Sequence, residues 1–252
     1  MTLGAHLAPR ARSHIEQADV VFVAVSDPLV ELWVQGMNAD VRSLQPYYAP
    51  GTPRTETYRH MVEAMLAEVR AGKRVCGAFY GHPGVFARVP HDAIAQAREE
   101  GYHAEMEAAV SAEDCLYADL GVDPGTYGCQ HYEASQFMFY KRRIDPSAYL
   151  ILWQIGLAGD QTLARFSATG PALRRVLLEL LLEQGYAMAD VAIAYEAATL
   201  PIAVPRMERL TLGELPEAEL RLETTLVVPP VRRMERNEVV ARQLAEMGQS
   251  GG

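Results

Sequence analysis

Arg54 and Tyr58 have the types and spacing that first suggest chemistry in this 252-residue sequence. Residues four apart on a helix lie on the same face, so the guanidinium and the phenol would project together. A guanidinium is permanently charged and can stabilise a developing oxyanion. Two interpretations stay open at this point: a functional pair, or a partly buried arginine that pairs with a carboxylate such as Glu56 or Glu63.

A second candidate is the loop Gly81-His82-Pro83-Gly84, which follows Tyr80 at the end of the apolar run Arg74 to Tyr80. Open α/β sheets bind ligands beyond the carboxyl ends of their strands. Two glycines permit close backbone approach, which suits an adenosyl group held by the main chain. A simple strand-to-helix turn is the alternative. Because the sequence contains neither GxGxxG nor GxxxxGK[ST], we do not expect a dinucleotide or P-loop site.

Other catalytic patterns are absent from the sequence. The histidines at positions 82, 91, 103 and 131 lack the spacing of metal ligands, so we expect no metal site. Ser111 lacks the GxSxG elbow of hydrolases. It is followed three residues later by Asp114, a spacing typical of a helix capping box.

The composition excludes several classes of partner. A formal net charge of -9 argues against nucleic acid and against an anionic membrane surface. No apolar run reaches the ~20 residues that span a bilayer, and the N-terminus does not resemble a signal peptide. Three cysteines without a CxxC pair indicate reduced thiols. We therefore expect a cytoplasmic protein.

Strands and helices are expected to alternate along the chain. Thr52 as N-cap, Pro53 and Gly72 predict the ends of the helix that carries Arg54. The other predicted helices cover residues 9–17, 92–100 and 170–183, and the predicted strands cover 20–25, 74–80, 149–154, 191–195 and 224–228. This alternation predicts two α/β lobes, 1–120 and 121–231, followed by a charged tail, 232–252, that is partly disordered but can hold a last helix. The turn-rich segment 121–146 marks the boundary, and the final GQSGG is expected to fray.

Four segments, YYAPGTPRTETY, GAFYGHPGVF, VSAEDCLYADLGVDPG and YLILWQIG, occur in an order and spacing that resemble the catalytic domain of the borosin α-N-methyltransferases. These enzymes belong to the tetrapyrrole-methylase superfamily. The resemblance runs from about residue 3 to residue 228. It implies two α/β lobes with the cofactor in the cleft between them. Many members of the superfamily begin with a strand. In this chain we expect that strand to be shortened or absent, because little sequence precedes the first helix.

The resemblance also implies site residues. In the family, an arginine and three tyrosines surround the target amide, and they match Arg54, Tyr48, Tyr58 and Tyr80. S-adenosyl-L-methionine is the implied cofactor and S-adenosyl-L-homocysteine the product. The expected cofactor-binding residues are Tyr80, Gly81, His82, Val85, Phe86, Ser111, Ala112, Gln154, Tyr195, Thr211 and Leu212.

The implied reaction is methylation of backbone amides in a ribosomally made precursor peptide. The tail after residue 228 is charged and offers no apolar core peptide, so the resemblance fits the split type, which methylates a separate precursor. It also implies a homodimer, or a heterotetramer with two precursors. Two alternatives remain: a methyltransferase for a tetrapyrrole or other small molecule, and a non-catalytic module that binds a peptide.

An amide nitrogen is a poor nucleophile, because its lone pair is delocalised into the carbonyl. Methylation therefore requires proton removal and stabilisation of an imidate-like oxygen. Arg54 is expected to stabilise that oxygen, and Tyr58 or Tyr80 to assist deprotonation, directly or through a water. Tyr58 is the preferred base, although the sequence leaves the choice open.

Overall fold

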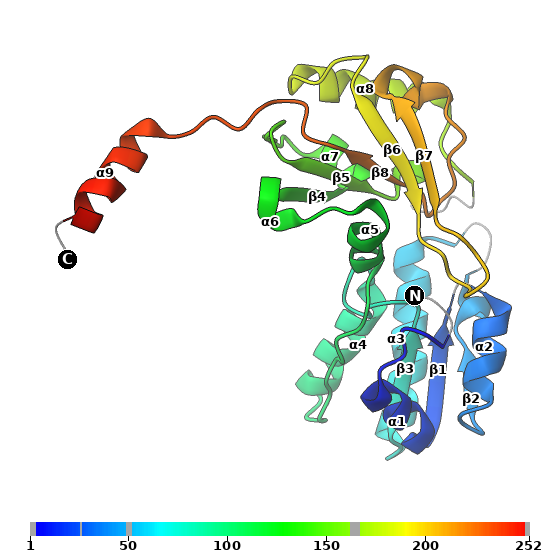
Figure 1. Cartoon of the computed structure of the whole chain (residues 1–252). Helices are drawn as coiled ribbons and strands as arrows, with labels where there is room; N and C mark the ends of the chain where they lie inside the picture. The colour runs from blue at the N-terminus through cyan, green and yellow to red at the C-terminus, as the bar shows by residue number, and fades with distance from the viewer. Residues whose placement is uncertain (1–3, 26, 49–51, 162–166, 250–252) are drawn as a thin grey trace. The chain divides into compact units, whose positions relative to one another are not determined.

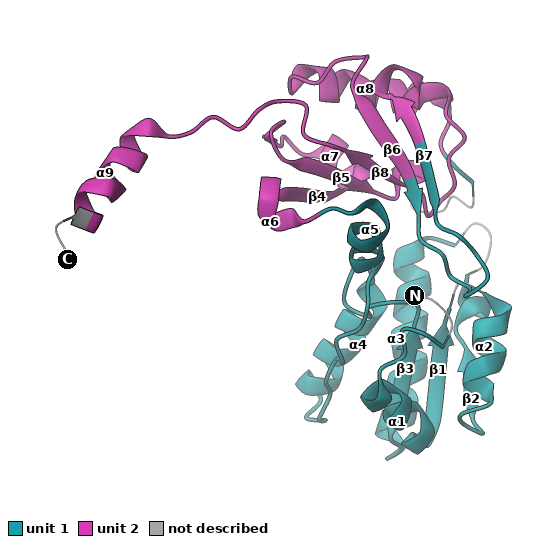
Figure 2. Cartoon of the chain, in the orientation of Figure 1, with its two compact units in different colours: residues 1–122, 160–168, 195–208 teal, residues 123–159, 169–194, 209–252 magenta. Residues whose placement is uncertain are grey.

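The computed structural model describes residues 4–25, 27–48, 52–161 and 167–249. They form two compact units (Figure 2). Unit 1 comprises the described residues of 1–122, 160–168 and 195–208, and unit 2 those of 123–159, 169–194 and 209–252. After entering unit 2 at residue 123, the chain thus contributes two later segments to unit 1. The lobes expected from the sequence, 1–120 and 121–231 with a tail at 232–252, stay a prediction.

Unit 1 is built on a short parallel sheet with strand order β2-β1-β3 (Figure 1). Its elements are α1 (Pro9–Gln17), β1 (Val20–Ala24), α2 (Pro28–Gln35), β2 (Val41–Ser43), the 3-10 helix η1 (Gln45–Tyr47), α3 (Arg54–Arg70), β3 (Val75–Phe79), α4 (Arg88–Glu99) and α5 (Ala112–Leu120). The helix expected over 9–17 and the strand expected from residue 20 are confirmed. Residues 4–8 form no strand, and residues 1–3 lie outside the described residues.

The middle strand, β1, is buried on both faces, as its continuous apolar sequence predicts. Val20, Phe22 and Ala24 pack in one core cluster with residues of α3 and α4. Val21 and Val23 pack on the opposite face with residues of α1 and α2. Because burying each of these larger side chains contributes roughly 1.5–3 kcal/mol, the strand fixes the sheet between its two helical layers.

Helix α3 begins one residue later than the sequence predicts. Thr52 was expected as N-cap with Pro53 in the first turn, but Pro53 is itself the N-cap, without a side-chain cap. Its ψ of 138° is extended rather than helical, so the helix starts at Arg54. The expected end is confirmed, since Ala71 is the C-cap and Gly72 has a φ of +82°.

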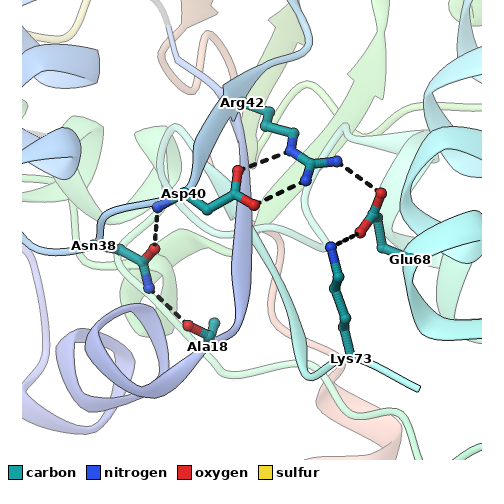
Figure 3. Close-up of polar contacts among 6 residues, drawn as sticks. All are labelled: Ala18, Asn38, Asp40, Arg42, Glu68 and Lys73. Atoms are coloured by element: carbon teal, nitrogen blue, oxygen red, sulfur yellow. Dashed lines mark hydrogen bonds and ion pairs between the residues drawn. The ribbon is translucent and has the colours of Figure 1, made fainter. Parts of the chain in front are cut away.

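A polar network ties β2 to α1 and α3 (Figure 3). The Arg42 guanidinium donates to both oxygens of Asp40, at 2.8 Å each, and to Glu68 of α3 at 2.7 Å. Lys73 forms a second ion pair with Glu68. The side-chain amide of Asn38 donates to the carbonyls of Ile15 and Ala18 at the end of α1, and its oxygen accepts from the Asp40 N–H.

Unit 2 contains a mixed sheet with strand order β4-β5-β8-β6-β7. Strand β5 runs parallel to β4 and antiparallel to β8. The elements of unit 2 are α6 (Pro124–Tyr127), β4 (Cys129–Glu133), α7 (Ala134–Phe139), β5 (Tyr149–Trp153), the 3-10 helix η2 (Ile155–Leu157), α8 (Pro171–Glu183), β6 (Val191–Glu196), β7 (Arg206–Thr211), the 3-10 helix η3 (Leu212–Glu217), β8 (Thr225–Val228) and α9 (Glu238–Gln249). The first residues of β7 and the last of β6 group with unit 1.

The three strands and the helix expected in this half are confirmed in outline, and the last helix in the tail is present as α9. The segment 121–146, expected to be turns, instead contains α6, β4 and α7. The β4 sequence CQHYE lacks both an apolar run and a clear alternation, so neither pattern reveals it. Residues 250–252 of the expected frayed end lie outside the described residues. No helix in the described part of the chain is long and apolar enough to cross a membrane.

We predict that Asn38→Ala lowers the free energy of unfolding by about 1–3 kcal/mol, because the substitution leaves two carbonyls and one N–H of a part-buried junction without their partner. Urea unfolding followed by circular dichroism measures the change. Gln17→Ala is the matched control, because Gln17 makes an exposed bond to Ser13. Equal stability of the two variants would contradict the role given to Asn38.

Candidate functional site

The loop that follows β3 is held in place by its own side chains and by α4. The Tyr80 N–H continues the parallel pairing by donating to the carbonyl of Ala24. Gly81 has a φ of +72°, a conformation that favours glycine. The Gly84 N–H donates to Nδ1 of His82 at 3.0 Å, and the Gly84 carbonyl lies 2.9 Å from Nε2 of His91 in α4. The loop therefore has a defined course.

Gly84 is the tightest point of this loop. A Cβ there would lie 2.6 Å from the Met106 sulfur and 3.3 Å from ring atoms of both His82 and His91. The neighbouring Phe86 has a φ of +51°, which a residue with a side chain seldom adopts. Strained backbone of this kind concentrates at binding sites and active sites. His91 and Met106, which our sequence interpretation missed, thus help shape the loop.

Tyr48, Arg54, Tyr58 and Tyr80 form a cluster in unit 1. The rings of Tyr48 and Tyr58 meet edge to face with centroids 6.5 Å apart, and their hydroxyls are hydrogen bonded. Tyr80 is close enough for its phenol to interact electrostatically with Tyr58 and Arg54. Three different elements supply these residues, namely the segment after η1, the first turns of α3 and the end of β3. The structure therefore brings together the four residues expected around the target amide.

One of the two carboxylates considered as a partner of Arg54, Glu63, has another partner. Glu63 accepts a hydrogen bond from Arg70 at 2.6 Å. Arg70 in turn binds both oxygens of Glu100, so this ion-pair network joins α3 to α4. Glu63 is thus already engaged in a different interaction.

The protonation of two of the phenols follows from their surroundings. Burial raises the pKa of Tyr48 to about 12, an effect that the charge of Arg54 only partly offsets. Its side-chain hydrogen bond with Tyr58 also raises that pKa. Burial likewise raises the pKa of Tyr80, although 56% of the residue is exposed, because its phenol lies among surrounding protein groups. Both are neutral hydrogen-bond donors at neutral pH.

The N-terminus of α5 lies near the same loop. Ser111 is buried and forms the expected capping box with Asp114: the Ser111 N–H donates to the carboxylate at 2.6 Å, and the Asp114 N–H donates to the serine oxygen at 3.2 Å. These bonds hold the pKa of Asp114 below its usual range, and the charge of His82 acts in the same direction. Ala112 is the first residue of the helix. His82, Ser111 and Ala112 are therefore brought together.

Tyr195, another expected cofactor residue, is held by a hydrogen bond to α5. Its side chain is buried, and its hydroxyl donates to Asp119 of α5 at 2.7 Å. Burial and this hydrogen bond raise its pKa. Since the hydroxyl is already satisfied, any contact of Tyr195 with a cofactor would have to use other atoms.

The remaining expected cofactor residues belong to unit 2. Gln154, at the end of β5, has a φ of +55°, the same kind of strained backbone as Phe86. Thr211 forms a capping box with Glu214 and so begins η3. Leu212 is fully buried in the core of unit 2, and its N–H donates to the carbonyl of Asp190. Contacts of these residues with a cofactor remain predictions, as do those of Val85 and Phe86.

A group of side chains with metal-ligating types occurs elsewhere on unit 1. His14, Glu105 and Glu107 place their ligand atoms within 4.8 Å of one another. Arg10 lies 2.8 Å from Glu107 and 3.5 Å from Glu105, so a cation already compensates both carboxylates. A hollow between α3 and α4, lined by Arg59, Glu63, Arg88 and their neighbours, contains none of the expected site residues. We assign neither feature to the site.

A parallel sheet with a glycine loop at the end of β3, together with a second unit on a mixed sheet, defines the protein as a two-unit α/β protein with a candidate ligand site at a strand end. The family model of the tetrapyrrole (corrin/porphyrin) methylases matches residues 3–216, and the chain belongs to this family.

Solved structures support the same fold. A uroporphyrin-III C-methyltransferase from Thermus thermophilus has a TM-score of 0.62 and 21% identity, with 92% of this chain and 91% of that chain covered. A cobalt precorrin-4 methyltransferase has a TM-score of 0.61 and 17% identity, with 88% of each chain covered. A further T. thermophilus structure, complexed with S-adenosyl homocysteine, has a TM-score of 0.58, 18% identity, and 88% and 90% coverage.

Relatives of higher sequence identity carry names that join a methyltransferase to a peptide precursor. A methyltransferase/ribosomally synthesized cyclic peptide gymnopeptides precursor from Gymnopus fusipes is 41% identical over 92% of this chain and 56% of its own length. A type I borosin cyclic peptide precursor of the same kind from Coprinopsis marcescibilis is 42% identical over 89% and 59%. The omphalotin A precursor from Omphalotus olearius is 40% identical over 93% and 57%. The chain thus spans little more than half the length of these relatives.

We predict that Asp114→Asn destabilises the protein by about 1 kcal/mol at pH 7, because it weakens the α5 cap. The folded-state pKa of Asp114 is depressed, so its contribution is present above the unfolded pKa and is lost as pH falls through the folded pKa. The stability difference from the parent should therefore shrink below pH about 4. Denaturant unfolding at several pH values measures it, with Asp92→Asn, in an exposed pair with Arg88, as control. A difference that is constant with pH would refute this account.

Proposed function

We propose that this chain is a borosin-type methyltransferase that uses S-adenosylmethionine to methylate backbone amide nitrogens of a separate, ribosomally made peptide. Two findings support the proposal: membership of the methylase family, and relatives 40–42% identical whose names join a methyltransferase to a cyclic peptide precursor. A homodimer, alone or with two bound precursors, belongs to the same proposal.

The observation that carries the proposal is the cluster of Arg54 with the phenols of Tyr48, Tyr58 and Tyr80. An amide must lose a proton before its nitrogen can attack a methyl group, and the negative charge then moves to the carbonyl oxygen. A cationic donor for that oxygen and a nearby proton acceptor are the two groups that this chemistry needs. The cluster contains both types.

We assign a role to each member of the cluster. Arg54 donates N–H groups to the imidate-like oxygen as its charge develops, the preorganised stabilisation that often dominates catalysis. Tyr58 takes the amide proton. Tyr48 positions the Tyr58 phenol through the hydrogen bond that joins their side chains. Tyr80, neutral at neutral pH, orients the peptide or assists the proton transfer as a donor.

When bound, S-adenosylmethionine supplies an electrophilic methyl group. The β3 loop that would hold such a group is fixed in place: Met106, His82 and His91 pack where a Cβ of Gly84 would stand, and the charge of His82 acts on Asp114 at the N-terminus of α5. We assign the binding role to Tyr80, Gly81, His82, Val85, Phe86, Ser111 and Ala112, together with Gln154, Tyr195, Thr211 and Leu212. The neutral character of most of these side chains suits a ligand recognised largely by backbone groups.

The segment after β8, as far as the structure describes it, does not resemble a substrate. Its residues are rich in charge, and its last part forms the helix α9, which carries Glu238, Arg242 and Glu246. An extended, apolar segment would expose amide nitrogens better than a helix, whose amides are hydrogen bonded.

The proposal is tested by incubating the protein with S-adenosylmethionine, with and without an added apolar precursor peptide encoded beside it. Tandem mass spectrometry should find one CH₂ mass increment per methyl on backbone nitrogens of the added peptide. Methylation of a tetrapyrrole instead would establish the small-molecule alternative. Peptide binding without any methyl transfer would establish the non-catalytic module.

We predict that Arg54→Ala lowers the rate of methyl transfer by roughly 10²–10³-fold, as for the loss of an oxyanion donor. Tyr58→Phe should lower it by about 10²–10⁴-fold, the range for a general base. Affinity for S-adenosylhomocysteine, measured by calorimetry, should stay within about threefold of the parent, because neither residue is assigned to that ligand. Arg59→Ala, on an exposed position of the same helix, is the control. Parent-like turnover in Arg54→Ala or Tyr58→Phe would remove the basis of the assignment.

We also predict that Gly84→Ala weakens S-adenosylhomocysteine binding by about tenfold or more, because the new Cβ, 2.6 Å from the Met106 sulfur and 3.3 Å from ring atoms of His82 and His91, displaces side chains that hold the loop. Gly170→Ala is the matched control, since nothing lies within 4 Å of a Cβ there. Calorimetric titration compares the two variants, and circular dichroism checks that both are folded. Unchanged affinity in Gly84→Ala would show that this loop does not hold the cofactor.

A further inference from the structure

The end of helix α7 gathers aromatic rings and positive charges at the surface of unit 2. Phe139 and Tyr140 are 46% and 58% exposed. Lys141, Arg142 and Arg143 follow directly, and all three are exposed. We call residues 139–143 the α7-end surface. Such a mixture of aromatic and cationic side chains is the composition that dominates binding hot spots.

Arg142 is positioned by two aromatic rings. Its guanidinium lies 5.3 Å from the ring centroid of Tyr132, on β4, and 5.9 Å from that of Tyr140. Stacking of this kind restricts the side chain before any partner binds, so less conformational entropy is lost on binding. A guanidinium held by its faces keeps its N–H edge available for a carboxylate, which it can bind with two parallel hydrogen bonds.

The charges of the α7-end surface are not compensated by the rest of the described chain. None of its three cations forms an ion pair with a described carboxylate. The nearest acidic residues in sequence have other partners: Glu133 accepts from two N–H groups at the start of α7, and Asp145 accepts from the N–H and hydroxyl of Ser147. By contrast, Arg70 of unit 1 binds two glutamates.

This local positive charge occurs in a chain whose formal net charge is -9. Overall repulsion disfavours a long polyanion such as RNA, and it disfavours an anionic membrane, because both extend well beyond three cations. A short peptide with a few carboxylates fits the size of the patch. Exposed rings on the same surface would cover the apolar side chains of such a peptide.

We propose that the α7-end surface binds a segment of the peptide substrate that carries Asp or Glu residues beside aromatic or apolar ones and lies outside the methylated residues. Naming the peptide as substrate rests on the proposed function. Arg142 and its neighbours bind the carboxylates, and the rings of Phe139 and Tyr140 cover the apolar side chains. Such a contact tethers the peptide and raises its effective concentration at the tyrosine-arginine cluster.

The test measures binding of a fluorescein-labelled 12-residue peptide that alternates Glu with Phe and Ala, by fluorescence anisotropy with the full chain. A second peptide has Gln in place of every Glu. The acidic peptide should bind at least about tenfold more tightly, with an affinity that falls as salt rises. Equal affinity for both peptides would overturn the proposal.

Two variants locate the binding. Lys141→Ser with Arg143→Ser should weaken binding of the acidic peptide by about tenfold, and Arg142→Lys by about threefold, because lysine keeps the charge but lacks the planar fork. The matched control, Arg12→Ser with Arg175→Ser, removes the same charge from exposed positions elsewhere and should leave binding unchanged. Equal weakening by both double variants would mean a non-specific charge effect and would reject the site.

Three further outcomes are distinguished. Tighter binding of a 12-nucleotide RNA than of the acidic peptide would reject the peptide as occupant. Dissociation of an oligomer by the Lys141→Ser with Arg143→Ser variant, seen by analytical ultracentrifugation, would identify a second copy of the chain as the occupant. Because the assay needs no methyl transfer, specific peptide binding without methylation would contradict the proposed function while leaving the binding surface in place.

Discussion

The lack of room for a side chain at Gly84 sets the course of the loop after β3, and the candidate site depends on that course. Met106, His82 and His91 occupy the space where a Cβ would stand. Their contacts fix the loop between the end of a parallel strand and the start of α4. Tyr80 precedes this loop directly, so its position relative to the first turns of α3 follows from the same packing. A change of one methyl group at this point would therefore displace side chains that hold the loop.

The rigid element behind this loop is the sheet of unit 1. Burial of β1 on both faces commits alternate side chains to two separate cores, so the strand cannot shift its register without exposing apolar surface on one face. Pairing of β1 with β3 then carries that register to Tyr80, whose N–H bonds to Ala24. The packing of the unit 1 core thus fixes the position of the Tyr80 backbone at the candidate site.

The sequence predicted those parts of the fold that carry a strong apolar pattern or a specific cap. The run from Val20 and the capping box of Ser111 with Asp114 are examples, because local chemistry decides both. Strand β4 was missed, since CQHYE shows its role only through pairing with β5. His91 was missed for a similar reason: its contact with Gly84 joins residues seven apart through a loop geometry that no spacing rule describes. The four residues of the cluster were identified by resemblance, whereas periodicity alone linked only Arg54 with Tyr58.

The charge state of the cluster bears on which substrates it suits. Tyr48 and Tyr80 are neutral at neutral pH. Neither phenol therefore supplies a negative charge to offset the permanent positive charge of Arg54. For a neutral amide, that charge interacts weakly with the ground state and strongly with the imidate-like oxygen, so its stabilisation is expressed mainly in the transition state. A substrate rich in carboxylates would instead bind Arg54 equally well before and during reaction, which would strengthen binding without accelerating the chemical step. Under the proposed function, the charge of Arg54 would therefore act mainly in the transition state of an uncharged acceptor such as a peptide amide.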